Sequence, residues 1–133
     1  MISSYSDLIQ ASRSQQEAQR LLFVFCRAEL PDEASADEQA AFERGEGGAL
    51  TPVICVDKTP DEAPDFGGLV EQSRSTGQNW DVVFVAAMSG RGGMAPSTDE
   101  AQQPLTMMVE SIRLGHIGNY LPLDAEGNAV SLG

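Results

Sequence analysis

The glycine-rich stretch SGRGG, residues 89–93, is the part of this chain best suited to bind an anion. Such loops expose backbone N–H groups, and a helix N-terminus adds positive potential where phosphates and carboxylates bind. Arg91 adds a guanidinium, and Ser97 followed by Glu100 is typical of a helix start. We therefore hypothesise a small-anion or nucleotide-phosphate site in segment 89–97, formed by Ser89, Gly90, Arg91, Gly92, Gly93 and Ser97. The alternative is a crossover loop whose glycines only supply positive φ angles.

The same stretch lacks the signatures of the specific nucleotide and hydrolase motifs. No GK[ST] follows it as in a P-loop, and the dinucleotide pattern GxGxxG ends after Gly92. A GxSxG nucleophile elbow is also absent, because Ala87 and Arg91 stand where its glycines belong. His116 is the sole histidine, so no tetrahedral His/Cys zinc site has a recognisable spacing. We expect no catalytic residues, no metal site and no cofactor.

The two cysteines, Cys26 and Cys55, lie in or at the end of apolar strand-like runs without CxxC spacing. In a cytosolic protein, such cysteines are reduced residues that pack like small hydrophobic side chains. We predict that both are buried, that neither is functional and that no disulfide joins them.

The charge balance excludes several classes of partner. Eight basic residues stand against 20 acidic ones, for a formal net charge of −12. Such a surface repels nucleic-acid backbones and anionic lipid, so we expect neither nucleic-acid nor membrane binding. No uncharged apolar run approaches the roughly 18 residues of a membrane helix, and the amino terminus has no basic region typical of a signal peptide. The composition predicts a cytoplasmic protein.

Three apolar runs predict the strands that position the glycine-rich loop. They cover residues 21–26, 50–56 and 82–88. Continuous apolar runs of this length are typical of strands buried on both faces, and we predict that 82–88 is a central strand. Pro52 cannot donate a ladder hydrogen bond, so it marks a strand beginning or a sheet edge.

Four helices are predicted between and around these strands. A short one follows Ser4, a thin acidic one covers 35–44 and ends at the sequence GEGG (45–48), a third covers 65–76, and the strongest covers 97–114. In the last, Leu105, Met108, Val109 and Ile112 recur at helical spacing, and Pro104 kinks the helix or starts it afresh.

Alternating strands and helices predict one α/β domain over residues 1–133. Crossover helices favour parallel pairing, so we expect a mainly parallel, possibly mixed, sheet flanked by helices. Residues 120–123 and 129–132 flank the turn-like sequence AEGN and predict an antiparallel C-terminal hairpin. If 35–44 is only an excursion, the first two strands pair antiparallel in a mixed sheet.

Five segments carry a resemblance to a known family. They are LLFVF (21–25), RAELPDE (27–33), RGEGGALTPVICVDKTP (44–60), VVFVAAMSGRGG (82–93) and LPLDAEGN (121–128). With them the chain resembles a family of small bacterial proteins labelled "ribonucleotide reductase subunit alpha", which assigns chemistry to none of these motifs. A reductase large subunit resembles a barrel several times this size, with a radical cysteine and further cysteine pairs. A chain of 133 residues with two cysteines cannot supply these, so we expect no reductase activity.

Two functional hypotheses from different classes remain. The first is a non-enzymatic interaction or accessory module that meets a protein partner, or a second copy of itself, through its acidic face or its apolar hairpin. The second is a small-anion site at the glycine-rich loop. The absence of a catalytic constellation in the sequence favours the first.

Overall fold

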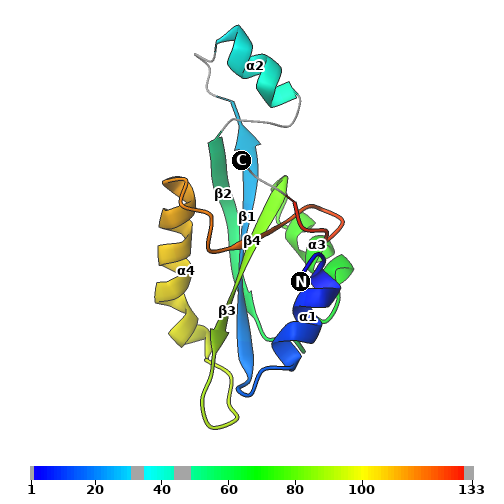
Figure 1. Cartoon of the computed structure of the whole chain (residues 1–133), viewed down its shortest axis with the longest axis vertical. Helices are drawn as coiled ribbons and strands as arrows, with labels where there is room; N and C mark the ends of the chain where they lie inside the picture. Colours follow the sequence, from blue (N-terminus) through cyan, green and yellow to red (C-terminus); the bar gives the residue numbers. More distant parts are fainter. Residues whose placement is uncertain (1, 31–34, 44–48, 131–133) are drawn as a thin grey trace.

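The computed structural model describes residues 2–30, 35–43 and 49–130. The elements follow in the order α1 (Tyr5–Arg13), β1 (Gln19–Glu29), α2 (Ala36–Glu43), β2 (Ala49–Lys58), α3 (Phe66–Arg74), β3 (Val82–Ser89), α4 (Thr98–Arg113) and β4 (Leu121–Leu123). In Figure 1 the sheet stands between α4 on one side and α1 and α3 on the other, while α2 lies beyond the end of the sheet.

The apolar run of β1 is buried on both faces because its side chains alternate between two cores. Leu21, Phe23 and Phe25 point toward α1 and α3. The intervening residues, Leu22, Val24 and Cys26, point toward α4. All six are at most 3% exposed. The strand therefore forms the centre of a three-layer molecule.

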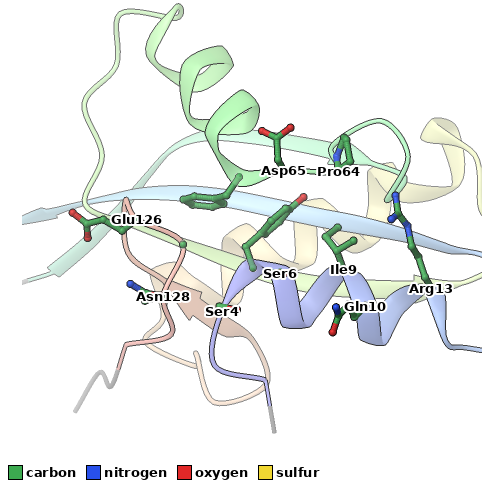
Figure 2. A pocket seen from close by; sticks show the side chains of 12 residues that line it. Ser4, Ser6, Ile9, Gln10, Arg13, Pro64, Asp65, Glu126 and Asn128 are labelled. Atoms are coloured by element: carbon green, nitrogen blue, oxygen red, sulfur yellow. The ribbon is translucent and has the colours of Figure 1, made fainter.

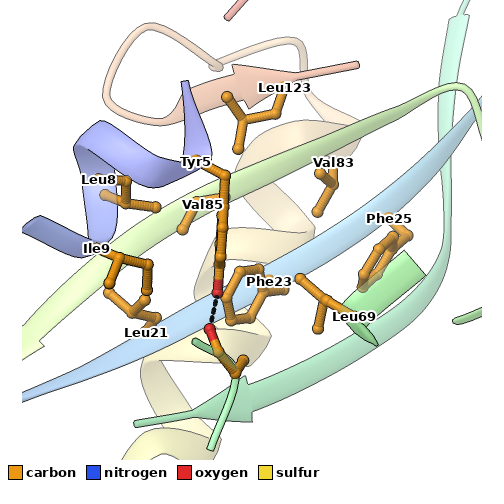
Figure 3. Close-up of a cluster of buried hydrophobic side chains, with 11 residues drawn as sticks. Tyr5, Leu8, Ile9, Leu21, Phe23, Phe25, Leu69, Val83, Val85 and Leu123 are labelled. Carbon is orange, nitrogen blue, oxygen red and sulfur yellow. Dashed lines mark hydrogen bonds between the residues drawn. The ribbon is translucent and has the colours of Figure 1, made fainter. Parts of the chain in front are cut away.

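The first core lies between the sheet and the helices α1 and α3 (Figure 3). Its helical members include Tyr5, Leu8 and Ile9 of α1 and Leu69 of α3. The Tyr5 hydroxyl donates a hydrogen bond to the carbonyl oxygen of Ala63, drawn as a dashed line in Figure 3. This bond joins α1 to the turn that precedes α3.

The second core lies under α4, where the predicted helical periodicity is confirmed. Ala101, Leu105, Met108 and Ile112 are buried against the sheet. The helix starts at the predicted N-cap, Ser97, and continues through Pro104 to Arg113 without a new start. The strongest predicted helix is thus correct in position and in its buried face.

The prediction of a mainly parallel sheet is wrong. The strand order is β2-β1-β3-β4, and β1–β2, β1–β3 and β3–β4 are all antiparallel pairs. The crossover through α3 does connect two strands of the same direction, β2 and β3, but β1 lies between them. The order of strands and helices along the chain limits how two strands can be connected. It does not determine whether a third strand, here β1, lies between them in the sheet.

The thin second helix explains the pairing of the first two strands. The side chains of residues 35–40 are exposed, and α2 lies beyond the sheet rather than on it (Figure 1). α2 is therefore an excursion between two antiparallel strands, as the alternative interpretation of residues 35–44 stated. Arg44 and the sequence GEGG (45–48), where the predicted helix ends, lie outside the described residues.

β2 is an edge strand, which confirms the interpretation of Pro52. The register shifts between Phe25 and Cys26, so that β2 has an extra residue, Val53, between the partners Ile54 and Pro52. Such a bulge is common at a sheet edge. Pro52 lies beside it, where a missing N–H costs least.

β3 is internal, as predicted, but only its first half is buried on both faces. Val82–Val85 are buried, whereas Ala87 is exposed and Met88 is partly buried. β4 pairs only with Val83–Val85, which leaves the second half of β3 without a neighbour on that side among the described strands. An apolar run therefore did not guarantee burial along its whole length.

The C-terminal turn has the predicted antiparallel form in its described part. Asp124 N–H donates to the Asn128 carbonyl at 2.9 Å, and Leu123 bridges Ala129. Ser4 in turn bridges Asn128. The second arm of the predicted hairpin extends to residue 132, and its residues 131–132 lie outside the described residues. No helix in the described parts of the chain is long and apolar enough to cross a membrane.

Candidate functional site

The glycine-rich loop folds into a tight reversal. Arg91 N–H donates to the Met94 carbonyl at 3.0 Å, and Met94 N–H donates to the Arg91 carbonyl at 3.1 Å. The two central residues, Gly92 and Gly93, have φ angles of 63° and 79°. A two-residue hairpin turn with positive φ at both central positions demands glycine or a similarly permissive residue. The alternative interpretation, in which the glycines only supply positive φ angles, therefore explains why Gly92 and Gly93 are glycines.

The loop N–H groups are bonded within the protein. Gly90 N–H donates to the Ala18 carbonyl at 2.8 Å, and Gly93 N–H donates to a carboxylate oxygen of Glu17 at 3.2 Å. A Cβ on Gly90 would lie 1.8 Å from the Met94 carbonyl oxygen, so this glycine permits close backbone approach. The N–H groups of Gly90, Arg91 and Gly93 are thus already engaged.

The helix start beside the loop is also satisfied internally. Ser97 Oγ accepts from Glu100 N–H, and the Glu100 carboxylate accepts from Ser97 N–H, both at 3.1 Å. The hydrogen bonds from Ser97 hold the pKa of Glu100 below its usual range. A negative carboxylate therefore occupies the position that an anion would take at the N-terminus of α4.

The predicted anion-site residues are brought only partly together. Ser89, Gly90 and Arg91 line a hollow of about 320 Å³, and Glu100 lines it too. Gly92 and Gly93 belong to the tight turn, and Ser97 caps the helix. With the N–H groups of Gly90, Arg91 and Gly93 engaged and two carboxylates nearby, this loop gives an anion little besides the Arg91 guanidinium.

The cysteines differ from each other, and the prediction that both are buried is wrong for Cys55. Cys26 is fully buried, and burial raises the pKa of its thiol to about 12. Cys55 is exposed because it lies on the edge strand, and both thiols are free. His116 is exposed past the end of α4. Within the described ranges, no group of His, Cys, Asp and Glu residues could hold a metal ion.

A larger hollow, which we call the α1–α3 groove, lies between α1, the start of α3 and the turn at residues 126–128 (Figure 2). Its volume is about 420 Å³. Its lining residues are Ser4, Tyr5, Ser6, Ile9, Gln10, Arg13, Pro64, Asp65, Phe66, Glu126, Gly127 and Asn128. Three separate segments of the chain therefore form one surface.

The floor of the α1–α3 groove is aromatic and apolar. The rings of Tyr5 and Phe66 have centroids 5.2 Å apart at an interplanar angle of 49°, and Ile9 and Pro64 lie beside them. Tyr5 is 3% exposed, whereas Phe66 is only partly buried. Burial and the nearby Asp65 carboxylate raise the pKa of the Tyr5 hydroxyl to about 12, so this phenol stays neutral.

The rim of the groove is mainly acidic. Asp65 and Glu126 are exposed at the side of α3 and at the turn, with Arg13 at the far end of α1 (Figure 2). Arg13 already pairs with Asp61, at 3.2 Å. Asp65 uses one oxygen, Oδ1, to cap α3 by accepting from Gly68 N–H at 2.8 Å.

A second hollow of about 420 Å³ continues this acidic surface around the start of α3. It shares Pro64 and Asp65 with the α1–α3 groove and adds Glu62 and Glu71. None of its lining residues is basic. The start of α3 is therefore flanked by negative charge on both sides.

Sequence reasoning missed the groove. Thr59 and Glu62 do form the reciprocal hydrogen bonds of a helix start, at 3.3 and 2.8 Å, but Pro64 ends this turn and α3 begins after Asp65. The available signal was the density of carboxylates around Pro64, yet one of the two rings of the floor, Tyr5, comes from α1, 58 residues before Ala63 in the chain.

No protein-family model matches this chain, and no curated protein and no solved structure matches it either. The resemblance to the family labelled as a reductase subunit therefore stays a prediction.

Proposed function

We propose that this chain is a non-enzymatic interaction module of the cytoplasm that binds a basic segment of a protein partner in the α1–α3 groove. One observation carries the proposal: an open hollow of about 420 Å³ combines an aromatic floor with a carboxylate rim. Concave sites with an apolar lining and a few convergent polar groups are the usual places for a ligand.

The chemistry of the groove favours a cationic partner that also carries apolar side chains. Phe66 presents a partly exposed ring, over which an arginine or lysine can lie in a cation–π contact. Asp65 and Glu126 offer carboxylates for charge-assisted hydrogen bonds. The net charge of −12 attracts a basic segment from a distance and speeds its encounter with the groove.

The competing hypothesis, a small anion at the glycine-rich loop, has less support. Arg91 and the hollow of about 320 Å³ favour it. Glu17, which accepts from Gly93 N–H, and Glu100, which caps α4, both oppose an anion there. The hydroxyl–carboxylate contacts among the described residues, such as Ser3 with Asp7 and Thr98 with Asp57, belong to a helix start and to a buried ion pair.

The test uses a synthetic peptide of alternating arginine and leucine, with a glutamate–leucine peptide as control. Binding is followed by amide chemical shifts of the full chain and by calorimetry. We expect shifts at Ile9, Phe66 and Asn128 with the arginine peptide and none with the glutamate peptide. Raising NaCl from about 50 to 500 mM should weaken the binding, because salt screens opposite charges.

Paired variants locate the site. Asp65→Asn keeps a side-chain oxygen for the α3 cap, so it removes charge without removing the cap. Combined with Glu126→Gln, it should weaken the arginine peptide about tenfold, or about 1.4 kcal/mol. Glu110→Gln, an exposed neutralisation on α4, is the matched control and should change nothing. Shifts centred on residues 89–97 with inorganic phosphate, and none in the groove with the peptide, would overturn the proposal.

A further inference from the structure

The two edge strands of the sheet, β2 and β4, differ in how far other parts of the chain cover them. At the β4 edge the chain covers itself: Val130 N–H donates to the Pro122 carbonyl at 3.1 Å, and Ala129 N–H donates to the Ser3 carbonyl at 2.8 Å. At the other edge, β2 has ten residues and, in the described portion of the chain, pairs with β1 alone. An edge strand left open is a template for another strand.

Protective features interrupt only part of this open edge. Pro52 and the bulge at Val53 follow the first three residues of the strand, and Lys58 closes the strand at its other end. Proline, bulges and lysine are the usual devices that keep edge strands from pairing. Between them runs the sequence Ile54-Cys55-Val56, which carries no charge and no proline. The unprotected part of the edge is therefore short and defined.

The three residues Ile54, Cys55 and Val56, which we call the seam, are exposed to a degree that agrees with an uncovered sheet edge. Ile54 and Val56 pack against the first core but remain partly exposed. They lie opposite Phe25 and Phe23, so both point to the α1 and α3 face, while Cys55 lies opposite Val24 and points to the α4 face. Cys55 is exposed. On each face of the sheet, the seam thus has apolar surface that the described parts of the chain leave exposed.

We propose that this edge of β2 pairs antiparallel with the same edge of a second copy, centred on Cys55. In an antiparallel pair centred on one residue, neighbours at equal distances on either side face each other. Ile54 of each copy then faces Val56 of the other, so an apolar side chain meets an apolar side chain in both directions. The interface is self-complementary, as a two-fold dimer requires.

The flanking residues fit the same register. Pro52 of one copy faces Lys58 of the other at the end of the paired run, where its missing N–H removes only a terminal hydrogen bond. Asp57 brings no unpaired charge to the seam, because its carboxylate is held by Arg20 at 2.7 Å and its side chain is only 11% exposed. The dimer joins the two sheets into one continuous sheet.

The net charge of −12 makes the dimer weak and salt-dependent. Two copies repel each other at long range, and the Debye length falls from about 10 Å at 0.1 M to about 3 Å at 1 M salt. Salt therefore strengthens the dimer, whereas it weakens a basic peptide in the α1–α3 groove. The opposite responses make failure of this proposal distinguishable from failure of the proposed function.

The test measures the mass of the full chain by sedimentation equilibrium up to about 500 µM, at about 50 and 500 mM NaCl. We expect a monomer–dimer equilibrium that is at least threefold tighter at high salt. Cys55→Lys places like charges against each other at the two-fold axis and should weaken association at least tenfold. Because Cys55 is exposed, the substitution leaves the core intact, which an unchanged melting curve checks. Met107→Lys, at an exposed residue of α4, is the matched control and should leave association unchanged.

Crosslinking checks the register. Added diamide takes two electrons and two protons from a pair of facing thiols and leaves a disulfide, which forms only when the two Cα atoms lie within about 7 Å. We expect a covalent dimer from the native chain and none from Cys55→Ala. A monomer at about 500 µM in high salt, or a dimer that Cys55→Lys does not weaken and diamide does not crosslink, would overturn the proposal.

Discussion

Replacing Arg20 by methionine tests a buried ion pair that belongs to a cluster joining three elements of the fold. An Arg20 NH group lies 2.7 Å from an Asp57 carboxylate oxygen, and these side chains are 12% and 11% exposed. Arg20 Nε–H donates to the Pro96 carbonyl, and Thr98 Oγ donates to the same Asp57 oxygen at 2.9 Å. The cluster therefore connects β1, β2 and the start of α4.

The expected loss in the free energy of unfolding follows from this burial. Methionine keeps the apolar stem of the arginine but leaves the Asp57 carboxylate with one donor, Thr98, in a site nearly closed to water. Removing one partner of a buried pair costs about 3–5 kcal/mol, a large part of the roughly 5–15 kcal/mol that stabilises a typical domain. Replacing both partners, Arg20→Met with Asp57→Leu, removes the unpaired charge and should recover most of the loss.

Urea denaturation followed by circular dichroism measures these free energies. Arg13→Met is the matched control, because Arg13 and Asp61 are 3.2 Å apart but have side chains 51% and 92% exposed. An exposed pair contributes less than about 1 kcal/mol. If Arg20→Met costs no more than Arg13→Met, or if the double variant is as unstable as the single one, the assignment of a buried, coupled pair is refuted.

Three further predictions concern the cores and the thiols. Val83→Asp places a charge on a side chain with no exposure and should unfold the domain; a variant with the native melting curve would contradict the central position of β3. Because burial raises the pKa of Tyr5 from 10.0 and that of Cys26 from 9.0, both to about 12, stability should hold below about pH 9 and fall as the pH rises toward 12. Tyr5→Phe should cost about 1–3 kcal/mol at neutral pH, because the buried Ala63 carbonyl loses its donor, and should reduce this alkaline loss to the part due to Cys26; an unchanged alkaline limb would refute it. A thiol reagent at pH 8 should modify Cys55 and spare Cys26 until urea is added; equal rates in the native protein would show that Cys26 is accessible.

Local structure could be predicted from the sequence because it depends on neighbours in the chain. Ser4, Asp65 and Ser97 each cap the helix that follows them. The apolar runs in β1, β2 and β3 are strands, since such runs must be buried and strands of this length bury them on a sheet. Pro52 marks an edge because proline lacks the N–H that a central strand needs.

Strand direction, the exposure of one cysteine and the groove were decided only by tertiary structure. α2 leaves the sheet because it has too little apolar surface to hold it there, so β1 and β2 meet directly as an antiparallel pair. Cys55 has nearly the same sequence surroundings as Cys26 but lies on an edge strand instead of a central one. The α1–α3 groove assembles Tyr5, Phe66 and Glu126 from segments that local patterns cannot relate. Such long-range packing depends on which surfaces meet, and periodicity along the chain does not encode it.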